Sequence, residues 1–172
     1  MEFLAVIKAE LPDWAKDIRL NLDGVIARST LSAEDAVGAA LAAAYAAKNS
    51  YLVAQFKSGL SDTDAHASLT AAALMGMNNV WYPYGEMTGD EQLKSMPAQL
   101  RMNAYSTHGG VDRKRFELFA LVASIIGKCH FCVKSHYELL KKEGYTTEQL
   151  RDAGRIAAVV NAAAMALTAQ GK

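Results

Sequence analysis

Four residues in the second half of the chain have types and a spacing that suit thiol chemistry. They follow the pattern Glu, eleven residues, Cys-x-x-Cys, three residues, His, and are Glu117, Cys129, Cys132 and His136. On a helix that begins near Gly127, the cysteines and the histidine stand at positions i, i+3 and i+7, which share one face. A cysteine pair with an ionisable partner on the same face is typical of redox or nucleophilic chemistry.

The position of the cysteines favours the thiolate, which is the reactive form of the side chain. Both lie in the first turn of the predicted helix, where unpaired N–H groups and the helix dipole stabilise an anion. Lys128 and Lys134 add positive charge nearby. We expect His130 to be exposed and, with Lys128, to have a modest role in tuning the thiolate fraction.

A proton relay is predicted if the chain reverses at Gly127 and the two flanking helices pack antiparallel. Glu117 lies ten residues before this bend and His136 nine residues after it, so both sit about 14–15 Å from the turn. His136, one turn beyond Cys132, can then act as its base while Glu117 orients the imidazole, so that the relay runs from Glu117 through His136 to Cys132, directly or through water. Cys129 is the resolving thiol: peroxide oxidises one sulfur to a sulfenic acid, and the neighbouring thiol closes a disulfide.

Two other roles are open for the same residues. A Cys-x-x-Cys motif can be half of a zinc site, with His136 and either Glu117 or His130 completing four ligands. The two cysteines can also be buried structural thiols. The remaining histidines, His66 and His108, are expected to be structural.

Helical spacing runs through nearly the whole chain, which predicts an all-α helical bundle. Apolar residues recur at steps of three and four from Leu4 to Leu22, and no segment alternates with period two between turn signals. Capping residues and breaks predict helices over 33–47, 50–59, 62–79, 113–126, 129–143 and 148–169, the last capped by Thr147. Residues 80–110, which include Pro83 and Pro97, are expected to be a linker with short helices.

The two halves of the predicted bundle, about residues 30–80 and 111–170, have the same order of elements: helix, break after a lysine, helix, glycine, capped helix. A shift of 80 residues aligns Ala40, Leu41, Ala43, Lys48 and Val53 with Ala120, Leu121, Ala123, Lys128 and Val133. Internal duplication within a single domain, residues 1–172, is therefore expected. Only the second half carries the cysteines, so the first half is expected to be scaffold, with the large residues of Leu74–Tyr82 in its core or at a subunit contact.

Length and composition limit the class of protein. The chain has 172 residues, 51% hydrophobic and 21% charged, which is typical of one globular domain. Its formal net charge of +0 gives no attraction to nucleic acid or to anionic lipid. No cationic and apolar leader is found, and no stretch has the roughly 20 apolar residues that a bilayer span needs. We therefore expect a soluble, cytoplasmic protein that binds neither nucleic acid nor membrane.

The sequence resembles the alkyl hydroperoxide reductase D (AhpD) family of the carboxymuconolactone decarboxylase-like superfamily. The resemblance covers nearly the whole chain and rests on three blocks, Leu11–Leu22, Met75–Tyr82 and Leu100–Asn103, together with the Glu-x11-Cys-x2-Cys-x3-His pattern. The combination is specific, whereas Cys-x-x-Cys alone is not. A carboxymuconolactone decarboxylase-like enzyme without redox thiols is a further alternative within this superfamily.

The resemblance implies an all-helical fold, a homotrimer, and thiol-dependent reduction of hydroperoxides without a bound cofactor. In the family the second cysteine is peroxidatic, which gives that role to Cys132 and the resolving role to Cys129, with Glu117 and His136 as the proton relay. It also implies regeneration by an external dithiol on a dihydrolipoamide-bearing protein, and electron delivery to a partner peroxiredoxin.

One position departs from the family pattern. Family members can carry a histidine immediately before the second cysteine, where this chain has Phe131, and its histidine stands one residue earlier at His130. On a helix this shift moves the imidazole by about 100°. A role that the family gives to that histidine therefore does not transfer to this chain.

Overall fold

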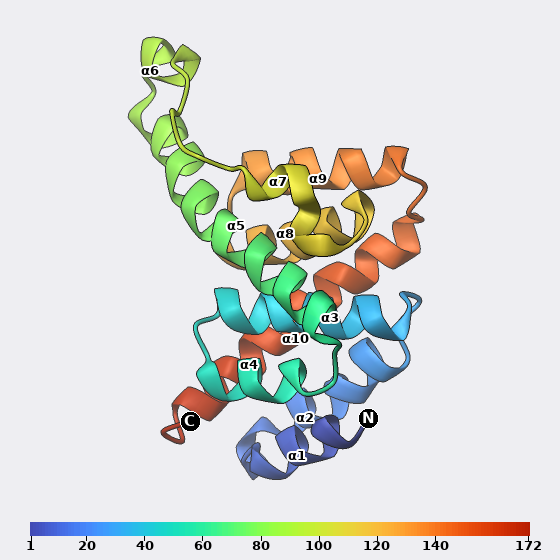
Figure 1. Cartoon of the computed structure of the whole chain (residues 1–172). Coiled ribbons are helices and arrows are strands. Elements are labelled where there is room, and N and C mark those ends of the chain that lie inside the picture. Colours follow the sequence, from blue (N-terminus) through green and yellow to red (C-terminus); the bar gives the residue numbers. More distant parts are fainter.

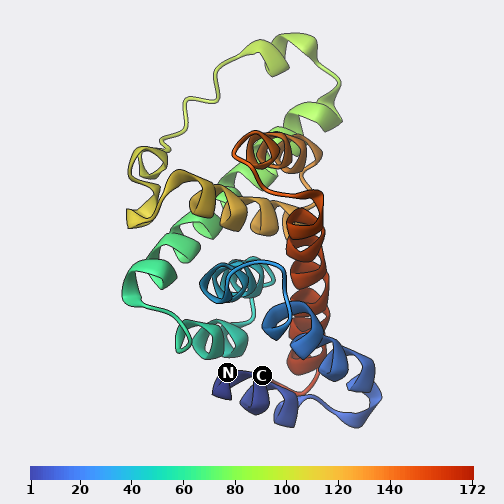
Figure 2. The same cartoon turned by 90° about the vertical axis from the view of Figure 1, so that its right-hand side faces the viewer.

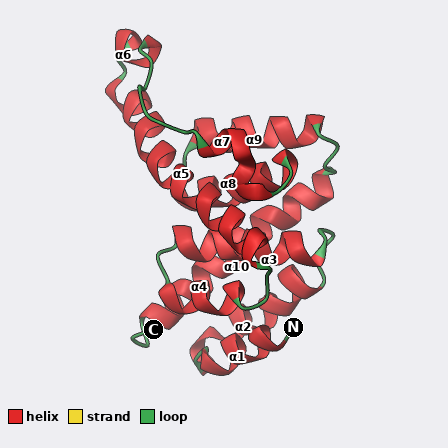
Figure 3. Ribbon diagram, in the orientation of Figure 1, coloured by secondary structure: helices red, strands yellow, loops and turns green.

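Every regular element of the protein is a helix. The computed structural model describes residues 1–172, and its helices are joined by loops and turns without any strand (Figure 3). The α-helices are α1 (Glu2–Glu10), α2 (Lys16–Leu22), α3 (Ala33–Ala46), α4 (Ser50–Lys57), α5 (Asp62–Thr88), α6 (Glu91–Ser95), α7 (Ala104–Thr107), α8 (Arg113–Gly127), α9 (His130–Lys142) and α10 (Thr147–Thr168). The predicted all-α fold class is confirmed. None of these helices combines the length and the apolar character needed to cross a bilayer.

Helix α3 forms the centre of the fold. Residues 36–44 are all buried, so this helix has no face toward solvent. Helices α5, α8 and α10 pack around it, as Figure 2 shows in a view nearly along its axis. A Cβ atom at Gly38 would lie 2.5 Å from the ring of Phe119 on α8. The Phe119 ring therefore occupies the space that glycine leaves open and fixes α8 against α3.

The N-terminal segment is helical but interrupted. Helix α1 ends at Glu10 because Leu11 is extended, with φ −77° and ψ 127°, as expected for a residue that precedes a proline. A 3-10 turn over Asp13–Ala15 then leads into α2, which continues into a π-helical turn. The C-terminal residue packs at the end of α1, where Lys172 forms an ion pair with Glu10.

Helix α5 is longer than predicted. The linker was expected to begin at residue 80, but the helix continues through Pro83 to Thr88 and ends at Gly89, whose φ is 65°. A proline inside a helix removes one hydrogen bond, yet the turn before it is held by tertiary packing, since Tyr82 stacks on Phe131 of α9 at 4.4 Å between ring centroids. The last turns of α5 and all of α6 project away from the bundle (Figure 1).

The two predicted halves have matching geometry. Lys48 and Lys128 both take the left-handed conformation, with φ of 59° and 55°. The residues after them, Asn49 and Cys129, each cap the next helix by accepting a hydrogen bond from the backbone N–H three residues on. Two copies of one motif would give this match, and duplication itself stays a proposal. Apart from α5, the expected boundaries agree within two residues, and the cap of α10 is Thr146 rather than Thr147.

A buried carboxylate fixes the segment before α3 to α10. Asp152 accepts hydrogen bonds from the backbone N–H of Thr30 at 2.8 Å, from the Thr30 hydroxyl at 2.9 Å and from Arg155 at 2.9 Å. Burial by itself would raise the pKa of Asp152, but these donors outweigh it and lower that pKa to about 2. The carboxylate therefore stays charged through the neutral range and joins positions 122 residues apart in the chain.

Candidate active site

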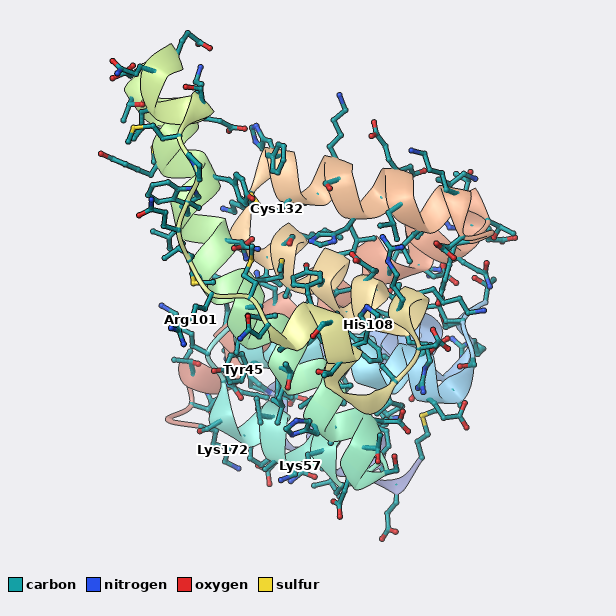
Figure 4. All side chains as sticks on the ribbon, turned by 45° about the horizontal axis from the view of Figure 1, so that its top comes forward. Tyr45, Lys57, Arg101, His108, Cys132 and Lys172 are labelled. Atoms are coloured by element: carbon teal, nitrogen blue, oxygen red, sulfur yellow. A yellow bond between two sulfur atoms is a disulfide. The ribbon has the colours of Figure 1, made fainter.

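The cysteines lie at a tight junction between α8 and α9. Helix α8 ends at Gly127, and Lys128 turns the chain in a left-handed conformation. Cys129 then caps α9, its sulfur accepting a hydrogen bond from the N–H of Cys132 at 3.2 Å. A side chain at position 127 would collide with Asn79 of α5, so glycine allows this reversal. The helix begins at His130, one residue later than predicted, and Cys132 lies in its first turn (Figure 4).

Cys129 and Cys132 are joined by a disulfide. Their exposed fractions are 0% and 3%, so both sulfurs are shielded by the fold. A four-ligand zinc site is not assembled here, because the sulfurs bond to each other and no group of three or more His, Cys, Asp or Glu side chains is arranged to hold a metal ion. The arrangement is that of an oxidised redox pair.

Glu117 and His136 form a buried pair on the facing sides of α8 and α9. The carboxylate Oε2 lies 2.6 Å from Nδ1 of the imidazole, and the two residues are only 4% and 8% exposed. Glu117 and His136 lie at nearly equal distances from the bend at Gly127. This spacing predicts their contact, and the structure shows it. A short hydrogen bond with a charged partner fixes both the ring orientation and the atom, Nδ1, that faces the carboxylate.

The other imidazole nitrogen does not meet a cysteine. His136 Nε2 lies 3.2 Å from the thioether sulfur of Met75 on α5, and no hydrogen bond joins His136 to either cysteine sulfur. In the disulfide form there is thus no direct contact from His136 to Cys132, and the predicted relay to the free Cys132 thiol, directly or through water, stays a prediction. A turn of the ring toward the sulfurs would break its contacts with Glu117 and Met75.

Met75 was missed as a site residue. It was expected in the core or at a subunit contact, and it is fully buried, but its sulfur contacts His136, a candidate site residue. Met75, Asn78 and Tyr82 stand at i, i+3 and i+7 on α5 and all reach the site. This spacing shows that they share a face, although it does not show which helix that face meets. The first half is thus more than a scaffold.

A cavity of about 250 Å³ brings the sulfur and the Glu117–His136 pair to one space. Its lining residues are Asn78, Tyr82, Met102, Tyr105, Glu117, Phe131, Cys132, Ser135, His136 and Leu139. The Tyr105 ring packs edge-on against Phe116 at 5.4 Å between centroids. Burial, and secondarily the charge of Glu117, raise the pKa of Tyr105, so its hydroxyl keeps its proton and can donate to a molecule in this cavity.

The two residues expected to tune the thiolate lie outside this cavity. Lys128 and His130 are exposed and border a separate surface hollow with Lys134 and Glu138. Phe131, the residue that departs from the family pattern, is half exposed and stacks on Tyr82 at the wall of the cavity. A tuning effect of Lys128 or His130 can act only through their charge, and it stays a prediction.

Comparisons with known proteins agree with this architecture. Residues 91–170 match the model of the Carboxymuconolactone decarboxylase family. A protein of Rhodospirillum centenum called alkyl hydroperoxide reductase AhpD is 42% identical over 171 residues, covering 97% of this chain and 91% of the relative. The chain belongs to the AhpD family. AhpD proteins of Maricaulis maris and Brucella canis are 40% and 36% identical, with at least 95% of both chains covered.

The AhpD similarity extends over both halves of the fold. The family model, in contrast, begins at residue 91 and therefore includes α8, α9 and α10 but not α5. The cysteine pair, Glu117 and His136 lie within the matched residues, whereas Met75 and Tyr82 lie before them. The AhpD relatives thus align with the whole candidate site, and the shorter family model with only part of it.

Proposed function

We propose that this protein reduces alkyl hydroperoxides through the Cys129–Cys132 pair. The observation that carries the proposal is the shared cavity: Cys132 in the first turn of α9, and the buried Glu117–His136 pair, open onto the same space, with a disulfide partner already bonded to Cys132. The relatives called alkyl hydroperoxide reductase AhpD support the same chemistry.

Cys132 is proposed as the peroxidatic residue because it alone of the two cysteines lines the cavity. Its thiolate attacks the terminal oxygen of ROOH, the O–O bond breaks, and the products are Cys132 sulfenic acid and an alkoxide that takes a proton to give ROH. The first-turn position favours the thiolate because N–H groups and the helix dipole stabilise the anion.

Cys129 then resolves the intermediate. Its sulfur attacks the Cys132 sulfenic acid, a disulfide forms, and the hydroxyl leaves with a proton as water. The Glu117–His136 pair handles these protons across the cavity through water, since no direct contact joins His136 to the sulfurs. Glu117 holds the imidazole in place for this role.

Return to the reduced state needs two electrons and two protons from an external dithiol. We assign this role to a dihydrolipoamide-bearing protein, with a peroxiredoxin as a further electron acceptor. A homotrimer without a resident cofactor, working in the cytoplasm, completes the proposal.

Anaerobic thiol titration tests the central step. Fully reduced protein is expected to show two free thiols, which disappear after one equivalent of an organic hydroperoxide. If both thiols remain free, the mechanism is wrong. Turnover of the same hydroperoxide with reduced lipoamide against other dithiols then tests the reductant, and the expected result is faster turnover with lipoamide.

The match to the Carboxymuconolactone decarboxylase family favours testing one alternative, a decarboxylase-like enzyme that needs no redox thiols. Under that alternative Cys132→Ser keeps full activity, whereas the peroxidase proposal expects near-complete loss. Metal analysis of protein purified without chelator tests the zinc-stabilised module: one tightly held zinc per chain would support it.

A further inference from the structure

The protonation of His136 can be read from the two atoms that its ring nitrogens face. Nδ1 faces the Glu117 carboxylate at 2.6 Å, and Nε2 faces the Met75 sulfur at 3.2 Å. Met75 is fully buried and His136 is 8% exposed. The Glu117 carboxylate and the Met75 sulfur are thus the hydrogen-bonding neighbours of the two ring nitrogens, so each contact has to be satisfied by these protein atoms.

The Met75 contact requires a proton on Nε2. A thioether sulfur accepts hydrogen bonds weakly and has no hydrogen to donate. If Nε2 carried a lone pair, two lone pairs would face each other at 3.2 Å in a buried site. If Nε2 carries a hydrogen, the same distance is an N–H···S hydrogen bond.

The Glu117 contact requires a second proton. A separation of 2.6 Å between Oε2 and Nδ1 is a hydrogen bond, and one hydrogen must lie between these atoms. Whether that hydrogen is bonded to nitrogen or to oxygen, the Glu117–His136 pair then holds two protons in total. Its net charge is zero in both arrangements, which suits a site with little access to solvent.

We propose that Met75 is a positioning residue that keeps a proton on Nε2 of His136 while the disulfide is closed. The Glu117–His136 pair is therefore already loaded with protons in the oxidised form and does not act as a base in it. To accept the thiol proton of Cys132 in the reduced form, the pair must first release the Nε2 proton or turn away from Met75. The effect of this proton on turnover rests on the proposed peroxidase function. The protonation of His136 in the disulfide form does not depend on that function.

The ionisable groups around the imidazole are few. Glu117 contacts it from α8, Tyr82 of α5 and Tyr105 of α7 line the same cavity, and Cys132, which precedes it on α9, does not titrate while it is bonded to Cys129. Burial raises the pKa of Tyr105, so this phenol does not take up a proton from the pair. Loss of the Met75 acceptor is thus expected to change the protonation of His136 without a compensating charged neighbour.

The direct test is ¹⁵N nuclear magnetic resonance of histidine-labelled protein in the disulfide form at neutral pH. The signals of His136 are identified by replacing each of the other three histidines in turn. We expect Nε2 to be protonated in the unaltered protein. An unprotonated Nε2 would overturn the proposal whatever the protein does to peroxides.

Met75→Leu tests the role of the sulfur, because it conserves volume but removes the acceptor. We expect the protonation equilibrium of His136 to shift about fivefold toward loss of the Nε2 proton, and the acid limb of the pH–rate profile to move to lower pH. Met75→Gln, whose amide oxygen can accept the same hydrogen bond, is expected to keep the original profile. Met87→Leu, on the exposed end of the same helix, is the control and should change neither measurement.

Two results separate the inference from the proposed function. If Met75→Leu leaves both the Nε2 signal and the acid limb unchanged, Met75 has no positioning role. If the protein shows no peroxide turnover at all, the proposed function fails, while the resonance measurement still decides the protonation of His136.

Discussion

Replacing Glu117 by glutamine tests the proton relay most directly. Glutamine has nearly the same shape, and its amide oxygen can still accept a hydrogen bond from Nδ1 of His136, so the contact at 2.6 Å can persist without the charge. A hydrogen bond to a charged group contributes about 1.5–3 kcal/mol and a neutral one about 0.5–1.5 kcal/mol. The expected loss of stability is therefore about 1–2 kcal/mol, since the imidazole can release a proton instead of staying charged without a partner.

The fall in peroxide turnover expected for Glu117→Gln is larger than the loss of folding stability alone would cause. At least a tenfold fall in peroxide turnover is expected, because about 1.4 kcal/mol corresponds to a factor of ten in rate and the pair also loses its capacity to take up a proton. Urea unfolding gives the stability, and hydroperoxide consumption with a dithiol gives the rate. Glu138→Gln, which changes an exposed carboxylate on α9, the helix that carries His136, is the matched control. Unchanged turnover in Glu117→Gln at the expected stability would show that the Glu117–His136 pair is structural and that the relay is wrong.

Three further predictions use other parts of the structure. Cys129→Ser is expected to consume one equivalent of hydroperoxide and stop at a Cys132 sulfenic acid, detectable by mass spectrometry, whereas Cys132→Ser consumes none; equal consumption by both variants would reverse or remove the assigned roles. Tyr105→Phe is expected to lower kcat/KM by about 3- to 10-fold with an unchanged urea midpoint, because Tyr105 lines the cavity and its protonated hydroxyl can donate to a bound hydroperoxide; an equal rate would show that this hydroxyl does not contact the substrate. The pKa of Asp152 is lowered from 3.8 to about 2, so its contribution of about 2 kcal/mol is present above pH 4 and is lost as the pH falls toward 2. Asp152→Asn should remove this acid dependence in unfolding curves measured from pH 6 to 2, and an unaltered dependence would contradict the assignment.

Local chemistry determined most of the elements. Side-chain caps such as Ser32 and Asp112 begin α3 and α8 at the predicted residues, because a side-chain oxygen satisfies a nearby backbone N–H whatever the rest of the chain does. Glu117 and His136 are separated from the bend after Gly127 by nearly the same number of residues. Because the rise per residue is the same in both helices, the two side chains lie opposite each other. The pair could therefore be predicted from spacing alone.

The extent of α5 could not be read locally. Pro83 predicts a break in the helix, because a proline inside a helix removes a backbone hydrogen bond, and this loss is a local property of the backbone. The stacking of Tyr82 on Phe131 joins residues that are far apart in the sequence, so its contribution becomes visible only when α5 and α9 are in place. Tertiary packing here outweighs the local signal.

The sequence by itself determined an all-helical chain, the position of the two cysteines at the start of a helix, and the meeting of Glu117 with His136 across one bend. Only the tertiary structure decided what the other side of the imidazole faces. Met75 reaches His136 from 61 residues away, on a helix whose crossing with α9 depends on how α3, α5 and α8 pack together. Hydrogen bonds within helices and across a short bend depend on local spacing, whereas contacts between distant helices depend on the crossing angles that the whole core sets.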